Sequence, residues 1–159
     1  MNSTIKLITF LTALSVAAFF SACGGSGNSS DSQSEDPSND AGGIIQKNPM
    51  MNKGIGPISS VTLGEEIDEA MAADGAVIYE AKCTACHKPT VKHIGPPPQG
   101  ILERRSPEWV MNMILNPEEM VQKDEIAKNL FIEFNGSPMA NQNLTEEEAR
   151  KVLEYFRTL

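Results

Sequence analysis

The chain has 159 residues, of which 40% are hydrophobic and 21% are charged, and its net charge is −8 at neutral pH. This acidic excess makes nucleic acid an unfavourable partner, because the phosphate backbone would be repelled. The sequence shows no internal repeat, and its length leaves room for one small core.

The N-terminal residues 1–22 read as an export signal, with one charge at Lys6 and an apolar run from Ile8 to Phe20. That run is short for a membrane-spanning helix. It ends in small residues before Cys23, which is similar to a bacterial lipoprotein cleavage site. We therefore expect Cys23 to carry lipid and to tether the protein to a membrane of the cell envelope, facing the periplasm or the cell surface. An ordinary signal peptide and an uncleaved anchor remain alternatives, and each would also export the chain.

Two segments of different character follow. Residues 23–43 are rich in Gly and Ser, acidic and almost free of apolar side chains, so they predict a flexible, disordered tether. Residues 44–64 contain hydrophobic side chains that could pack on a domain. Their prolines and glycines exclude a long regular element, so we predict an irregular lead-in, ordered or half-ordered. The remaining residues, 65–159, form the predicted domain.

The first predicted helix spans 65–82 and leads directly into a cysteine pair. Its apolar residues form an imperfect helical stripe: Ile67, Ala70, Met71, Val77, Ile78 and Ala81. Gly75 interrupts the stripe. A glycine inside a helix costs about 1 kcal/mol relative to alanine, and we expect it to allow close approach by another helix.

The segment Cys83-Thr84-Ala85-Cys86-His87 has the spacing of the c-type haem attachment motif. Each thiol can add to one vinyl group of a porphyrin and form a thioether, while the adjacent imidazole can bind the iron through Nε2. We therefore predict one covalently attached haem c, with its iron, held by Cys83, Cys86 and His87.

A zinc site and a redox dithiol are the other interpretations of two cysteines at this spacing. Zinc would require a second pair of ligands, and the chain offers only Cys23 and His93. A thioredoxin-like dithiol would require a βαβ context, for which the sequence gives no sign. A non-haem dithiol oxidoreductase nevertheless remains an alternative.

Residues 88–105 contain prolines and glycines that exclude helix and sheet, so we expect this segment to wrap around the cofactor. A metal-bound histidine usually donates its second N–H to an acceptor. The Gly95-Pro96 segment is the expected source of that acceptor for His87. His93 is too close to His87 in the chain to reach the opposite face of the iron easily, and we interpret it as a surface residue.

Four further helices are predicted. Ser106-Pro107 predicts an N-cap and first turn, with Val110, Met113 and Ile114 facing inward. Asn116-Pro117 repeats the signal, and a helix is predicted over 123–134. Thr145 and Glu148 form a capping box before a final helix with an amphipathic stripe: Ala149, Val152, Leu153 and Phe156. The pattern predicts an all-α fold.

An electron-carrying haem iron requires a second axial ligand, and a soft thioether raises the potential. Met139 lies in a Pro-containing loop, which can bring its sulfur over the ring. Methionines on helices usually fill cores. Met139 is therefore the predicted ligand, with Met120 and an open site as alternatives.

Over residues 66–159 the chain resembles the class I monohaem cytochromes c, through the Cys83–His87 motif and the Gly95-Pro96-Pro97 segment. The resemblance implies a small helical fold around the haem, with the Pro96 carbonyl accepting from the proximal histidine. It places Gly75 and Tyr79 against Tyr155 and Phe156 where two helices cross. It also assigns Arg104, Arg105 and Trp109 to the propionate side, although plain core packing is an equal interpretation of Trp109. Met139 matches the axial methionine, with the family's Met-Pro order reversed.

These features predict a monomeric electron carrier rather than an enzyme, exchanging single electrons with a redox donor and acceptor, such as a terminal oxidase or reductase. Three lysines near the motif, Lys82, Lys88 and Lys92, either steer an acidic partner or are scattered surface charges. The alternative function is a gas sensor or small haem enzyme with an open distal site.

Overall fold

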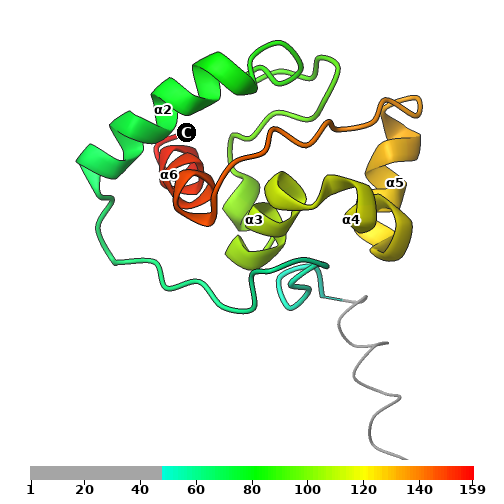
Figure 1. The fold of residues 1–159 in the computed structure, drawn as a ribbon, viewed down its shortest axis with the longest axis horizontal. Coiled ribbons are helices and arrows are strands. Elements are labelled where there is room, and N and C mark those ends of the chain that lie inside the picture. Colours follow the sequence, from blue (N-terminus) through cyan, green and yellow to red (C-terminus); the bar gives the residue numbers. More distant parts are fainter. Residues whose placement is uncertain (1–47) are drawn as a thin grey trace, which may run out of the picture. The chain divides into compact units, whose positions relative to one another are not determined.

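The computed structural model describes residues 48–159. The predicted signal peptide, Cys23 and the tether of residues 23–43 lie outside the described residues. The helices that the structure contains are α2 (Glu69–Lys82), the 3₁₀ helix η1 (Ile101–Glu103), α3 (Pro107–Leu115), α4 (Pro117–Lys123), α5 (Glu125–Glu133) and α6 (Glu146–Phe156) (Figure 1). Residues 48–159 contain no strand, and the predicted all-α fold is confirmed. Among these residues, no helix is both long and apolar enough to cross a membrane.

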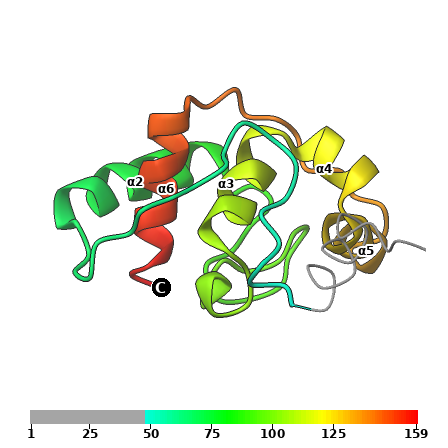
Figure 2. The same ribbon diagram turned by 90° about the horizontal axis from the view of Figure 1, so that it is seen from below.

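Helices α2 and α6 cross in direct contact (Figures 1 and 2). Gly75 lies at the crossing, where a Cβ atom would overlap the backbone carbonyl of Lys151 in α6. One turn further along α2, the Tyr79 ring packs against Tyr155 and Phe156, at centroid distances of 5.2 and 5.8 Å. The prediction that Gly75 permits a close helix crossing is confirmed.

Helix α2 begins later than predicted and buries a different face. Asp68 is its N-cap, because the Asp68 side chain accepts a hydrogen bond from the Met71 N–H, so the predicted start at residue 65 is wrong. The buried face consists of Ala72, Gly75 and Tyr79. The predicted stripe is wrong in part, since Val77 is 71% exposed. The reason is the crossing itself, which requires small side chains where α6 approaches.

The other helix starts follow the capping signals. Ser106 accepts from the Trp109 N–H at the start of α3, and Pro117 occupies the first turn of α4. Asp124 caps α5 by accepting from the Ala127 N–H, and α5 lies within the predicted range of 123–134. Thr145 and Glu148 form the predicted capping box of α6.

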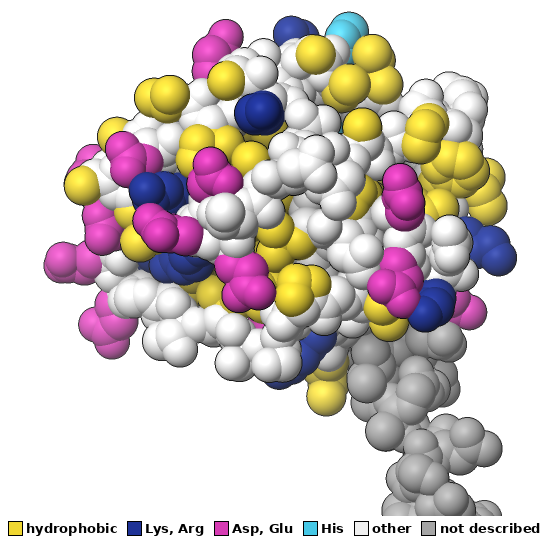
Figure 3. Space-filling view, in the orientation of Figure 1, with side chains coloured by type: hydrophobic (Ala, Val, Ile, Leu, Met, Phe, Trp, Pro, Cys, Tyr) yellow, Lys and Arg dark blue, Asp and Glu magenta, His cyan; other side chains and the backbone are white. Residues whose placement is uncertain are grey.

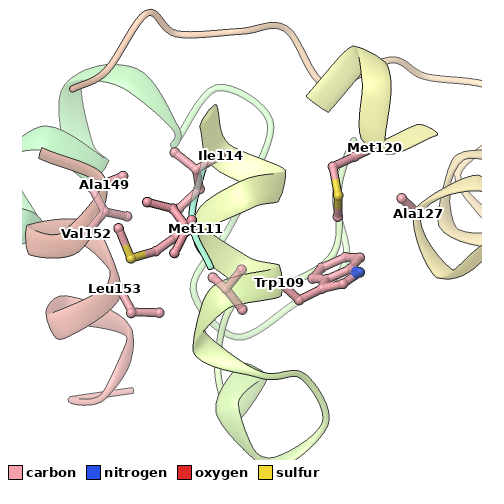
Figure 4. Close-up of a cluster of buried hydrophobic side chains, with 10 residues drawn as sticks. Trp109, Met111, Ile114, Met120, Ala127, Ala149, Val152 and Leu153 are labelled. Carbon is pink, nitrogen blue, oxygen red and sulfur yellow. The ribbon is translucent and has the colours of Figure 1, made fainter. Parts of the chain in front are cut away.

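The hydrophobic core lies between α3 and α6 and extends to α4 and α5 (Figure 4). Met111 of α3 points toward Val152 and Ala149 of α6, and Trp109 and Met120 fill the side nearer α5. The predicted stripe of α6 is largely confirmed, because three of its members are buried: Ala149, Val152 and Leu153.

Residues 48–64 precede α2 and run alongside α3 without regular secondary structure (Figure 2). Buried Asn112 of α3 holds this segment through three hydrogen bonds. Its Oδ1 accepts from the Ile58 N–H, and its Nδ2 donates to the carbonyls of Lys53 and Ile58, all at 2.9 Å. These three hydrogen bonds satisfy backbone groups that have no partner in a helix or sheet, and they hold the irregular segment against α3.

Candidate functional site

The site is a cavity enclosed by all five α-helices of the described part of the chain. Its wall is mainly hydrophobic, with side chains from each helix, among them Tyr79, Val110, Val121, Leu130 and Phe156. The remaining wall comes from the segment after α2 and from the loop between α5 and α6. Such a cavity suits a large, mainly apolar ligand.

Cys83 and Cys86 lie at the C-terminal end of α2 and face this cavity with free thiols. The turn is closed by the Cys83 N–H, which donates to the Tyr79 carbonyl, and by the His87 N–H, which donates to the Cys83 carbonyl, both at 2.8 Å. Burial, with a smaller contribution from the neighbouring Cys86, raises the pKa of Cys83 to about 11. Cys83 is therefore a neutral thiol at physiological pH. Addition of its S–H bond across a vinyl group would form one S–C bond and one C–H bond.

His87 lies in the cavity wall with its ring held on one side. Its Nδ1 is 2.8 Å from the backbone carbonyl of Pro96. A carbonyl oxygen can only accept, so Nδ1 carries the proton and Nε2 keeps its lone pair for a metal. This is the arrangement that metal-binding histidines commonly show.

Two further residues hold His87 in place. A Cβ atom at Gly95 would overlap the imidazole, so only glycine lets the chain pass the ring at this distance. The Tyr79 hydroxyl donates to the His87 carbonyl at 2.8 Å. Burial raises the pKa of Tyr79 to about 12, assisted by the neighbouring Cys83 and Tyr155, so the phenol remains a donor at physiological pH. From the sequence, Tyr79 is expected only at the helix crossing, and its hydrogen bond to the His87 carbonyl is a second role that was not predicted.

The methionines differ in what their sulfur atoms contact. Met139, in the loop before α6, and Met113 of α3 both line the cavity. Met120 is fully buried outside the cavity wall, and its Sδ accepts a hydrogen bond from the Ile55 N–H at 2.9 Å. That contact occupies the Met120 sulfur and disfavours it as an iron ligand.

Of the residues assigned to the propionate side, Arg105 and Trp109 lie together, whereas Arg104 makes its contacts elsewhere. Trp109 is buried and lines the cavity, so both interpretations of its role are compatible with its position. Arg105 lies over the Trp109 ring, 5.4 Å from its centroid, and its buried Nε has no hydrogen-bond partner among the described residues. Arg104 donates to the carbonyls of Pro97 and Gln99 and does not contribute to the cavity wall. His93 is exposed, as predicted.

The residues present fit a covalently bound haem. Cys83, Cys86, His87 and Met139 line one mainly apolar cavity, and the absence of a side chain at Gly95 leaves space for the imidazole of His87. Within residues 48–159, no three His, Cys, Asp or Glu side chains gather as they would around a structural zinc ion. Structural zinc sites use four such ligands and catalytic ones three, whereas one imidazole and one thioether would be sufficient to hold a haem iron.

Comparison with known proteins gives the same result. The family model described as "Cytochrome c" matches residues 72–159, more than half of the chain. Among solved structures, a cytochrome c from Rhodothermus marinus is 42% identical, with a TM-score of 0.63, covering 65% of this chain and 88% of that one. An engineered cytochrome c from Rhodothermus marinus, Rma TDE, is 41% identical, with a TM-score of 0.62, covering 65% and 89%. The same engineered protein bound to a carbene intermediate is also 41% identical, with a TM-score of 0.60. No curated protein matches the chain.

Proposed function

Because the chain belongs to the cytochrome c family, which binds haem c covalently and transfers electrons, we propose that it is a monohaem electron carrier whose iron is held by His87 and Met139. The observation that carries this proposal is one cavity lined by Cys83, Cys86, His87 and Met139. When bound, haem c supplies an iron that changes between the ferrous and ferric states.

The protein holds His87 in a fixed orientation through three contacts. The hydrogen bond between His87 Nδ1 and the Pro96 carbonyl fixes the tautomer and orients Nε2. The Tyr79 hydroxyl and Gly95 hold the His87 backbone and ring from two other directions. A ligand that is already oriented moves little between oxidation states, which favours rapid electron transfer.

Met139 is proposed as the other ligand because it and Met113 are the two described methionines that line the cavity. Met113 is fixed on α3 within the cavity wall, and the sulfur of Met120 accepts an amide hydrogen bond. Met139 lies in an irregular loop that can adjust its sulfur position, and it is only half-buried. A thioether favours ferrous iron and gives a higher potential than a second imidazole.

The apolar wall of the cavity also raises the reduction potential. Burial in a poorly polar environment disfavours the additional positive charge of ferric iron. The cavity wall is mostly hydrophobic, with Val110, Ile114 and Leu130 among its members. We propose that this wall and the Met139 thioether together maintain a positive reduction potential, and that no substrate is transformed.

The docking side of the proposed carrier would lie beside the attachment motif. Val91 and Ile94, a few residues past the motif, are exposed hydrophobic side chains. Figure 3 shows hydrophobic side chains over much of the face in view, with a denser group towards its upper right. Lys88 donates to the Thr84 carbonyl, and Lys92 pairs with Glu133 and lies over the Phe134 ring. We propose that Lys82 and Lys88 steer an acidic redox protein, and that the charge of Lys92 is largely balanced by Glu133.

The cellular setting is proposed from the sequence. Lipid on Cys23 would hold the domain at the outer side of a bacterial cytoplasmic membrane or at the cell surface, within reach of a membrane-bound oxidase or reductase. A monomer suits a carrier that exchanges partners quickly.

The test is a potentiometric titration of the full-length protein, matured with covalent haem, followed by exposure of the reduced form to CO. A carrier gives one reversible one-electron transition and a reduced spectrum unchanged by CO. High-spin iron with ready CO binding would instead support the gas sensor or haem enzyme. Failure to attach haem in the presence of the maturation proteins would support the dithiol oxidoreductase.

A further inference from the structure

A hydrogen-bond network centred on Asp124 adjoins the cavity through Trp109, and its other members have no part in the site described so far. Asp124 is 6% exposed. Its Oδ1 accepts from the Trp109 Nε1 at 3.1 Å and from the Ala127 N–H at 2.8 Å. Its Oδ2 accepts from the Asn52 Nδ2 at 2.6 Å, the one hydrogen bond to that oxygen among the described residues. A buried carboxylate oxygen left without a donor is costly, so the hydrogen bond from Asn52 stabilises the buried Asp124 carboxylate.

Asn52 is itself fixed on the lead-in segment. Its Oδ1 accepts from the Gly54 N–H at 2.8 Å, and its carbonyl accepts from the Ser106 hydroxyl at 2.5 Å. The side chain can therefore present Nδ2 to Asp124 without searching through rotamers. This arrangement joins residues far apart in the sequence, since Asn52 precedes α2 and Asp124 caps α5.

The same segment also passes close to the indole, at Gly54. Gly54 adopts a φ of +73°, and a Cβ there would lie 2.7 Å from Met120 Sδ and 3.2 Å from Trp109 Cδ1. Figure 4 shows the Met120 side chain extending toward the Trp109 ring. Trp109 is thus confined by the lead-in on one side and hydrogen-bonded to Asp124, while its ring lines the cavity.

We propose that Asn52 is a positioning residue of the haem cavity, acting through Asp124 to hold the Trp109 indole in the wall and thereby to tune the reduction potential. The inference rests on the electron-carrier function proposed above. It assigns a role to a residue that precedes the part of the chain matched by the family model.

The charges around Asp124 explain why an amide, rather than an acid, serves at position 52. Arg105 lies close enough to this carboxylate to be influenced by its charge: the pKa of Arg105 is lowered by burial and by Arg104, and the charge of Asp124 partly opposes that lowering. Asn52 adds a donor without adding charge, so Arg105 and Asp124 remain balanced. A carboxylate at position 52 would keep the acceptor used by Gly54 but would add negative charge beside Asp124, which favours ferric iron.

The experiment compares three variants of the full-length haem protein with wild type. Asn52→Asp exchanges the donor for a charged acceptor, and Asn52→Ala removes the donor without adding charge. Asn48→Asp is the control, because it adds the same charge to an exposed residue whose Oδ1 accepts from the Met50 N–H and which makes no hydrogen bond to Asp124. Ultraviolet resonance Raman reports the hydrogen bond of the indole N–H, and Trp109 is the only tryptophan. The midpoint potential is measured on the same samples.

We expect the indole N–H band to move in both Asn52 variants and the midpoint potential to fall in Asn52→Asp, with neither changing in Asn48→Asp. An unchanged band and potential in both Asn52 variants, even with lower stability, would reduce Asn52 to a structural role and overturn the proposal. An equal fall in Asn48→Asp would also overturn it, because the effect would then be one of net charge. If wild type shows no reversible one-electron couple, the carrier function fails, and the Raman comparison still decides whether Asn52 positions Trp109.

Discussion

Gly75 of α2 lies directly against the backbone carbonyl of Lys151 in α6, with no room for a side chain between them. The two helices therefore approach as closely as backbone allows, and Tyr79, Tyr155 and Phe156 pack beside the crossing. This contact orients the end of α2, from which the chain passes directly to Cys83.

Substitution of Gly75 by alanine is expected to separate the crossing helices, because neither the helix backbone nor the Lys151 carbonyl can move independently. We expect a loss of about 3 kcal/mol in the free energy of unfolding, at the upper end for overpacking, measured by chemical denaturation. Gly64→Ala is the matched control, since its Cβ would lie 3.3 Å from the Glu66 carbonyl and a small shift suffices. A Gly75→Ala protein as stable as the control would show that the crossing is not tight.

A second contact between α6 and the start of α2 predicts sensitivity to acid. Burial tends to raise the pKa of fully buried Glu154, but the Asp68 N–H together with Arg150 and Arg157 lowers it below the ordinary 4.5. The carboxylate therefore stabilises the fold above about pH 4.5, and this contribution is lost as the pH falls through the lowered pKa.

Glu154→Gln should remove that dependence. We expect the variant to lose roughly 2–4 kcal/mol at neutral pH, because two guanidinium groups lose their partner, and to show a shallower decrease in stability between about pH 5 and pH 3. Denaturation at a series of pH values provides the measurement. The exposed residue of the same helix, Glu146, gives the control Glu146→Gln. Parallel pH profiles for wild type and Glu154→Gln would contradict the assignment.

The proposed steering role predicts a salt-dependent association rate. Lys82→Gln with Lys88→Gln should slow association with an acidic redox protein by roughly tenfold at low ionic strength, as measured by stopped-flow spectroscopy. The effect should vanish in high salt. Lys53→Gln is the control, because Lys53 lies in the lead-in and pairs with Glu108. If the double variant associated as fast as wild type, Lys82 and Lys88 would be ordinary surface charges.

The proposed anchor predicts a change of fractionation. Cys23→Ser should leave export intact but move the protein from the membrane fraction to the soluble fraction, and mass spectrometry of the wild-type N-terminus should show added acyl chains. Ser21→Ala keeps a small residue before the cysteine and should remain anchored. Continued membrane association of Cys23→Ser would indicate an uncleaved signal helix.

Much of the site was predictable because its signals are local. The Cys83–His87 spacing specifies the attachment chemistry, and Ser106, Pro117 and Thr145 mark helix starts through capping. The glycine at 75 indicated a helix crossing for the same reason, since only a close approach justifies its cost inside a helix.

The missed features depend on contacts between distant segments. Asp68 caps α2 and also donates its N–H to Glu154, and a run of acidic residues gives no sign of which one will be the cap. The lead-in is held by Asn112 and Asn52, whose partners lie more than 50 residues away in the chain. Polar side chains that satisfy remote backbone groups leave no periodic pattern in the sequence.

The axial ligand is the central claim, and one absorption measurement tests it most directly. Ferric iron bound to a thioether sulfur gives a weak far-red band, which is recorded for wild type, Met139→Ala and Met113→Leu. We expect the band in wild type and in Met113→Leu, and its loss in Met139→Ala together with CO binding to the reduced form. A band that persists in Met139→Ala would contradict the account, because another methionine would then hold the iron.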